Sequence, residues 1–278
     1  MEVSTVTVTR MDAGRFVEAS DQLAVEEPLQ IQLLYGSSGN EQQKNLSVTM
    51  RTPGNDEELA AGFLYTEGII RNNNQLIDII AGASGTNTVL AILKGNYIPD
   101  LQSGERNFYV TSSCGVCGKS SIEAIRREME YPVSPDPVHI SPSVLHQLPD
   151  ALRKQQAIFQ STGGLHACAL FNNAGNLIAL REDVGRHNAL DKLIGNAFLT
   201  DQLPFRNVVL LLSGRASFEL IQKAAIAGIR IIAAIGAPSS LAVQLADEAG
   251  ITLIGFLKPD RFNIYTGPER IAETADQI

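Results

Sequence analysis

The chain has 278 residues and a mass of 29.9 kDa, a length that predicts about two domains. It is 44% hydrophobic and 19% charged, as expected for a folded globular protein. Its net charge of −8 argues against electrostatic binding to duplex nucleic acid, which needs a basic surface. We expect no membrane insertion, because no apolar run approaches the ~20 residues that span a bilayer. The amino terminus lacks a signal peptide's basic head and apolar stretch, and three cysteines suit a reducing cytosol, so we expect a cytoplasmic protein.

Residues 1–110 are predicted to form a small, β-rich α+β domain. Alternating polar and apolar residues predict half-buried strands at 3–10, 29–33 and 46–51. A helix is expected from Asp56 to about Gly68, and further short strands at 89–93 and 108–110. This part carries no obvious chemistry, and we interpret it as a scaffold or docking surface.

Residues 111–141 are predicted to be a mobile loop, a helix and a connector. The loop contains Cys114-Gly-Val-Cys117 and is rich in glycine and serine. Ser120 and Glu123 have the spacing of a capping box that begins a helix to about Glu130. Four closely spaced prolines follow, which indicates a hinge between domains.

Residues 142–278 are predicted to form a three-layer α/β/α domain. A helix is expected over 143–160, followed by a hairpin of strands at 166–171 and 177–181. Helices at 188–198, 218–227 and 241–249 then alternate with apolar strands at 208–212, 230–235 and 251–256. Continuous apolar strands between helices are typical of a sheet covered on both faces.

Cys114 and Cys117 are the first candidates for chemistry. They precede the amino terminus of the predicted helix, and Lys119 adds a positive charge, which together favour the thiolate form. A thiolate can attack or accept sulfur, and the flanking glycines leave both thiols accessible. This favours a pair of reactive, exposed thiols.

Other interpretations of this pair stay open. It could be half of a structural zinc site completed by His166 and Cys168, or a tight turn with inert thiols. A thioredoxin-like redox site is less well supported, because the βαβ pattern begins far downstream.

The second candidate site is the set of turns that follow the last three predicted strands. If these strands are parallel, all three turns lie at one sheet edge, where open α/β sheets bind ligands. Backbone amides at two helix starts, with basic side chains, suggest a nucleotide-like anion, although each turn alone could be only a helix cap. No glycine pattern of a Rossmann fold or P-loop is present. The candidate residues here are Ser213, Gly214, Arg215, Gly236, Lys258, Asp260, Arg261 and Asn263.

A third group of polar residues lies where the second hairpin strand leads into a helix: Glu182, Asp183, Arg186 and His187. It is either a capping and salt-bridge cluster or a substrate contact, and the sequence favours neither. Zinc-dependent deamination is rejected, since Cys168 stands where the deaminase signature needs Glu and no P-C-x-x-C follows. His139 and His146 are expected to be solvated.

Several motifs, taken in order, resemble the FdhD family of accessory sulfur carriers for formate dehydrogenase. The resemblance extends from the early strands to about Ile271. Its most specific motif is the block from Asp183 to Lys192. The motifs are Cys114-Gly-Val-Cys-Gly118, Thr162-Gly-Gly-Leu-His-Ala167, Asp183-Val-Gly-Arg-His-Asn-Ala-Leu-Asp-Lys192, Ser213-Gly-Arg-Ala-Ser217 and Asn263-Ile-Tyr-Thr266 with Arg270-Ile271.

The resemblance implies a cytoplasmic sulfurtransferase that takes persulfide sulfur from a cysteine desulfurase. It would pass this sulfur to the molybdenum or tungsten bis-molybdopterin guanine dinucleotide cofactor of formate dehydrogenase, bound as a substrate, with no permanent metal. Cys114 would carry the persulfide and Cys117 would assist, whereas Cys168 has no assigned task. The domain of residues 142–278 would be cytidine deaminase-like in fold and the protein a homodimer. The alternative is a chaperone that only binds the cofactor. The cofactor-contacting stretch would be Phe256, Leu257, Lys258, Pro259, Asp260 and Arg261.

Overall fold

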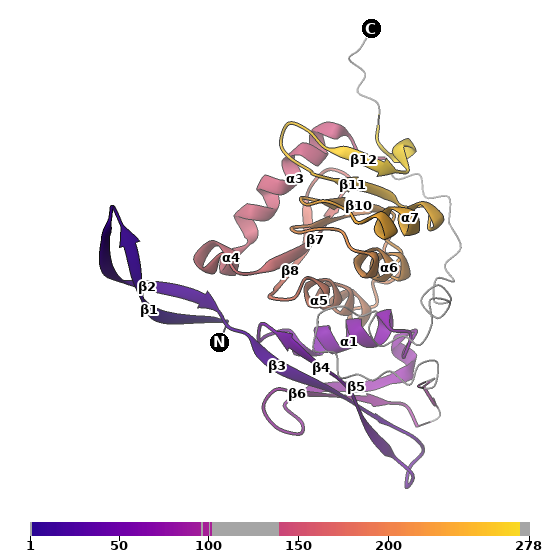
Figure 1. Ribbon diagram of the computed structural model, residues 1–278. Helices are drawn as coiled ribbons and strands as arrows, with labels where there is room; N and C mark the ends of the chain where they lie inside the picture. Colours follow the sequence, from indigo (N-terminus) through magenta and orange to yellow (C-terminus); the bar gives the residue numbers. More distant parts are fainter. Residues whose placement is uncertain (1, 96, 100, 102–138, 273–278) are drawn as a thin grey trace.

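The computed structural model describes residues 2–95, 97–99, 101 and 139–272 (Figure 1). The predicted thiol loop at 114–117, strand at 108–110 and helix at 120–130 lie outside these residues. The proposed boundaries 1–110, 111–141 and 142–278 stay a prediction for the same reason. Among the described helices, none has both the length and the apolar character to cross a membrane.

The amino-terminal part contains a projecting arm and a small sheet (Figure 1). The arm is an antiparallel hairpin of β1 (Val3–Asp12) and β2 (Arg15–Ala24). The sheet has the order β4-β3-β6-β5, in which only β3 and β6 are parallel neighbours. Its elements are β3 (Glu27–Tyr35), β4 (Gln42–Arg51), α1 (Asp56–Thr66), η1 (Asn73–Gln75), β5 (Leu76–Ala81) and β6 (Thr88–Leu93). This confirms a β-rich α+β unit, although β2 and β5 were not predicted.

The carboxy-terminal part is a six-stranded sheet of order β12-β11-β10-β9-β7-β8. Strands β9, β10 and β11 are parallel, whereas β7 runs antiparallel to both β8 and β9, and β12 runs antiparallel to β11. Its strands are β7 (His166–Asn172), β8 (Leu177–Asp183), β9 (Val208–Leu212), β10 (Ile231–Ala234), β11 (Thr252–Gly255) and β12 (Asn263–Thr266).

Helices cover both faces of this sheet, which confirms the predicted three-layer architecture. Apolar residues of α5, α6 and α7 pack on one face, and the buried stripe Leu145, Leu148 and Leu152 of α3 packs on the other. The helices are α3 (Pro142–Gln155), α4 (Ala157–Thr162), α5 (Arg186–Leu199), α6 (Phe218–Ile226) and α7 (Ser240–Glu248), and η3 (Pro268–Arg270) follows β12.

The single helix expected over 143–160 is in fact two helices, so that prediction was wrong. The backbone leaves the helical region at Gln156, with φ −78° and ψ 76°, between α3 and α4. The first amides of α4 at Ile158 and Phe159 donate to the Glu182 carboxylate instead of to a preceding helical turn. A side chain distant in sequence therefore stabilises the break.

Helices α1 and α5 join the two parts of the molecule (Figure 1). Gly62 of α1 and Gly195 of α5 leave no space for a Cβ atom, because each faces backbone of the other helix. Buried leucines of both helices, including Leu59 and Leu190, belong to one continuous hydrophobic core. The small sheet is therefore packed firmly against the domain that carries the candidate site.

Candidate functional site

The three turns after β9, β10 and β11 lie at one edge of the sheet, as the sequence predicts. Gly236 N donates to Gly214 O at 2.9 Å, and Phe256 N donates to Gly236 O at 3.1 Å. A Cβ on Gly236 would lie 2.9 Å from Gly214 O, which explains why this turn requires glycine. The backbones of the three turns are thus stacked into one rigid rim.

Strand β7 brings a further segment to the same edge. Because β7 is antiparallel to β9, it begins where β9 ends. Ala167 N donates to Ser213 Oγ at 2.8 Å, and Ser213 N donates to Ala167 O at 3.0 Å. The preceding residue, His166, lies beside Gly214, whose Cβ would come within 3.2 Å of the imidazole Nδ1. The rim therefore contains the start of β7 as well as the three turns.

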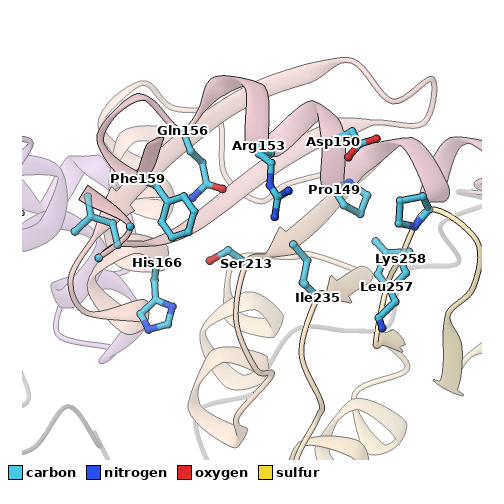
Figure 2. A pocket seen from close by; sticks show the side chains of 14 residues that line it. Pro149, Asp150, Arg153, Gln156, Phe159, His166, Ser213, Ile235, Leu257 and Lys258 are labelled. Atoms are coloured by element: carbon cyan, nitrogen blue, oxygen red, sulfur yellow. The ribbon is translucent and has the colours of Figure 1, made fainter. Parts of the chain in front are cut away.

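A cavity of about 550 Å³ opens between this rim and helix α3 (Figure 2). Its volume is within the range typical of small-molecule sites. The lining combines the helix, the α3–α4 junction, the start of β7 and the turns after β9, β10 and β11. The lining residues are Pro149, Asp150, Arg153, Gln156, Phe159, Gly163, Gly164, Leu165, His166, Ser213, Ile235, Leu257, Lys258 and Pro259.

Four of the residues predicted for this site line the cavity: Ser213, Leu257, Lys258 and Pro259. Two others, Gly214 and Gly236, form the backbone of the rim without lining the cavity. The remaining five do not line it, although their side chains are exposed at the turns or at the start of β12. These five are Arg215, Phe256, Asp260, Arg261 and Asn263.

Sequence reasoning missed the contribution of α3. Pro149 and Arg153 form a stripe four residues apart, next to the buried stripe of this helix. Figure 2 shows the Arg153 guanidinium directed into the cavity, above Ser213. One feature of the sequence could have indicated this contribution: Arg153 lies next to the apolar face of an amphipathic helix. A cation in that position lies at the boundary of the core.

The cavity contains two cationic side chains, Arg153 and Lys258, and one carboxylate, Asp150. Guanidinium and ammonium groups in the same lining as the Ser213 hydroxyl suit a phosphate-bearing ligand. The apolar side chains of Phe159, Ile235 and Leu257 in the lining suit a flat ring of the same ligand, next to its phosphate.

The turn after β11 is held in a fixed shape. Lys258 N donates to Arg261 O at 2.9 Å, and the ring Nδ1 of His146 lies 2.8 Å from Lys258 O. The His146 ring also packs against Phe262, with 5.2 Å between centroids. The prediction that His146 is merely solvated was therefore wrong, whereas His139 is exposed as expected.

The group around Asp183 is a structural cluster. The Asp183 carboxylate is fully buried, pairs with Lys192 Nζ at 2.7 Å and accepts from the backbone N of Thr52 and Gly185. Lys192 in turn donates to Thr52 O at 2.8 Å. The Glu182 carboxylate caps α4, and burial raises the pKa of Glu182. For these two carboxylates the capping and salt-bridge interpretation is the one that the contacts support.

The histidines near the rim are largely enclosed. His187 is buried, and its Nε2 lies 3.4 Å from Ser217 Oγ and 3.5 Å from the Glu219 carboxylate. Burial lowers the pKa of His166, and the nearby charges of Arg186 and His187 lower it further. The surroundings of His166 therefore favour the neutral imidazole over its protonated form.

Cys168 lies in the core, 1% exposed, on the face of β7 that packs against α5. Desolvation strongly raises the pKa of this thiol, which opposes the thiolate form that zinc ligation requires. The described residues contain no group of three or more acidic, histidine or cysteine side chains arranged to hold a metal. Cys114 and Cys117, the predicted sulfur-handling pair, lie outside the described residues.

Comparisons with known proteins agree with this fold. The model of the FdhD/NarQ family matches residues 24–272. A "Sulfur carrier protein FdhD" of Streptomyces coelicolor is 49% identical over 274 residues, covering 95% of this chain and 94% of the relative. One from Sulfolobus acidocaldarius is 41% identical, covering 98% and 99%. A crystal structure described as a candidate formate dehydrogenase accessory protein from Desulfotalea psychrophila has a TM-score of 0.75 at 25% identity, covering 98% of this chain and 100% of that one. The chain therefore belongs to the FdhD/NarQ family.

Proposed function

We propose that this protein carries persulfide sulfur from a cysteine desulfurase to the molybdenum or tungsten bis-molybdopterin guanine dinucleotide cofactor, before that cofactor serves formate dehydrogenase. Its relatives bear the name sulfur carrier protein, which supports the sulfur part. The observation that carries the cofactor part is the cavity at the sheet rim, which is lined by Arg153, Lys258, the Ser213 hydroxyl and an apolar wall. Such a lining suits one guanine nucleotide arm of the cofactor.

The first transfer would be a thiolate exchange. The Cys114 thiolate attacks the terminal sulfur of the donor's persulfide, the bond between the donor's two sulfur atoms breaks, and the donor thiolate leaves. No net oxidation occurs, because one sulfane sulfur moves between two thiolates. Cys114 then holds the sulfur as a persulfide.

The second transfer would deliver sulfide to the metal of the bound substrate. The Cys117 thiolate attacks the inner sulfur of the Cys114 persulfide, which forms a Cys114–Cys117 disulfide and releases sulfide to the metal. Two electrons pass from the two cysteine sulfur atoms to the departing one. A cellular dithiol reductant would then restore both thiolates.

Mass spectrometry tests the sulfur step. The full chain is incubated with a cysteine desulfurase and cysteine, alkylated and digested, and the Cys114 peptide should gain the mass of one sulfur atom. Cys114→Ala should abolish this gain, whereas Cys117→Ala should preserve it. No gain in the wild type, or an undiminished gain in Cys114→Ala, contradicts the proposal.

Calorimetric titration with GDP tests the cavity. Arg153→Ala should weaken binding on the order of tenfold, because a charge-assisted contact with phosphate is lost. Arg206→Ala is the matched control, since Arg206 is exposed and precedes β9, at the opposite sheet edge. If both variants bind GDP with equal affinity, the cavity is not the nucleotide site and this part of the proposal is contradicted.

A chaperone that binds the cofactor without sulfur chemistry is the second candidate, and the same cavity favours it. It predicts that Cys114→Ala still supports formate dehydrogenase activity in cells while Arg153→Ala does not. The sulfur carrier predicts that both variants lose this activity.

A further inference from the structure

Helix α4 lies between two cavities. Its Phe159 lines the cavity at the sheet rim and is among the side chains drawn in Figure 2, whereas the preceding residue, Ile158, lines a second cavity of about 270 Å³. The position of α4 therefore shapes both cavities. The other residues that line the second cavity are Glu2, Thr52, Pro53, Asn55, Leu180, Arg181, Glu182 and Lys192.

The side chains of α4 anchor it weakly. Residues 158–162 are the part of this helix whose side chains the structure describes, and none of them is buried. The side-chain hydrogen bonds of Gln160, Ser161 and Thr162 end on backbone carbonyls of α4 itself or of α3. A helix of six residues is marginal on its own, so contacts with the rest of the fold must stabilise it.

The chain can turn at both ends of α4. Gln156, before the helix, has ψ 76°, outside the helical region, and Gly163, after it, has φ 67°. A Cβ atom on Gly163 would meet no other atom within 4 Å, and one on the next residue, Gly164, would come no closer than 3.7 Å to the Ala24 side chain. Two glycines in open surroundings are residues that can absorb a change of backbone angle.

The Glu182 carboxylate connects α4 to the sheet. Its Oε1 accepts from Phe159 N at 3.2 Å and its Oε2 accepts from Ile158 N at 3.4 Å. Glu182 belongs to β8, where it lies opposite Ala167 of β7 in the strand register, so its backbone is fixed. Gln156, at the N-cap position, makes no side-chain cap. Hydrogen bonds to a charged acceptor are roughly twice as strong as neutral ones, so this carboxylate is well suited to hold the helix.

We propose that Glu182 is a positioning residue for the nucleotide cavity, because its carboxylate holds α4 through two backbone amides and thereby fixes the Phe159 ring in the cavity wall. Glu182 itself is absent from the lining of that cavity, so it acts on the ligand through α4. The inference rests on the proposed binding of a guanine nucleotide there. When Glu182 is protonated or replaced, α4 turns about its two ends and the cavity loses its shape.

The charges around Glu182 determine how this contact depends on pH. Arg181 and Lys192 line the same cavity but pair with other carboxylates, whereas Glu2 is a like charge. Neither α4 nor Ala167, opposite Glu182 on β7, contributes a titratable side chain. Burial is the main cause that raises the pKa of Glu182, Glu2 raises it further, and the α4 amides oppose this shift. A protonated carboxyl accepts these amides less well, so α4 should be released as the pH falls through the raised pKa.

Hydrogen exchange of the full chain without nucleotide, followed by mass spectrometry, tests the contact. In Glu182→Gln the peptide that contains residues 157–163 should exchange at least about tenfold faster than in the wild type. A carboxamide has one acceptor oxygen where the carboxylate has two, and it turns a donor toward the second amide. Glu248→Gln, at an exposed position of α7, is the matched control and should leave this exchange unchanged.

Calorimetric titration with GDP over a range of pH tests the positioning role. At pH 8 Glu182→Gln should bind GDP about tenfold more weakly than the wild type. The ratio of the two affinities should approach one as the pH falls to 5, because a protonated Glu182 resembles the carboxamide. Titration of the GDP phosphate affects both proteins equally and cancels in this ratio. If Glu182→Gln has an altered circular dichroism spectrum, Glu182→Asp replaces it, since the shorter side chain cannot reach both amides.

Unchanged exchange in Glu182→Gln overturns the inference, as does an affinity ratio that stays constant with pH, which would indicate a general loss of stability. Faster exchange with unchanged GDP affinity also overturns it, provided that Arg153→Ala weakens binding. If Arg153→Ala binds GDP as the wild type does, the nucleotide site itself is wrong and the positioning role falls with it. The two failures are distinguishable, because the exchange is measured without nucleotide.

Discussion

Gly62 of α1 and Gly195 of α5 meet where the two helices cross with their backbones in direct contact. A Cβ atom on Gly62 would overlap the carbonyl of Asp191, and one on Gly195 would overlap the carbonyl of Glu58. This crossing fixes the small amino-terminal sheet against the domain that carries the cavity.

Gly195→Ala should therefore destabilise the fold, although alanine favours a helix by about 1 kcal/mol over glycine. The added methyl group forces the helices apart, and we expect a net loss at the upper end of the ~1–3 kcal/mol typical of overpacking. Urea denaturation followed by circular dichroism measures this loss. An unchanged or increased free energy of unfolding would show that the crossing is not tightly packed.

Lys192→Met should destabilise the protein by about 3–5 kcal/mol, because it leaves the buried Asp183 carboxylate without its charged partner. The matched control is Lys154→Met, because Lys154 is exposed and a surface substitution changes stability little. Denaturant midpoints of both variants provide the comparison. Equal losses would contradict a special role for the buried pair.

The free energy of unfolding should depend on pH through His166. Its pKa in the folded chain is lowered from the ordinary value of about 6.5, so the folded state resists protonation more than the unfolded state does. This contribution is present above pH 6.5 and is lost as the pH falls through the lowered pKa. His166→Gln should lose less stability than the wild type between pH 7.5 and 5.5. An equal loss of stability in His166→Gln and in the wild type over this range would contradict the prediction.

Phe256→Gly should stabilise the fold by about 1 kcal/mol while weakening GDP binding. Phe256 has φ 53°, in the left-handed region that is costly for a bulky residue, and its ring is 43% exposed. An exposed aromatic ring held at the rim in this way suits stacking on a base, and its loss should weaken binding about tenfold. Phe256→Tyr should keep both the strain and the affinity. If Phe256→Gly binds GDP as the wild type does, the ring does not contact the nucleotide.

Much of the fold follows from local patterns. The continuous apolar strands β9, β10 and β11, the helices between them and the 166–183 hairpin have the periods that the sequence predicts. The turn residues Ser213, Gly236 and Lys258 could be placed at one edge because parallel strands end on the same side. Thiol chemistry at Cys114 and Cys117 is likewise a prediction from residue type and spacing alone.

Tertiary structure decided what local patterns cannot encode. Arg153 reaches the cavity only because α3 packs across the sheet, and Asp183 is a buried ion-pair partner only because α5 brings Lys192 beside it. The break at Gln156 depends on the Glu182 carboxylate, which reaches α4 from β8. Periodicity indicates which face of an element is apolar. It does not indicate which segment covers this face or which charges are buried there, because both depend on contacts between segments distant in sequence.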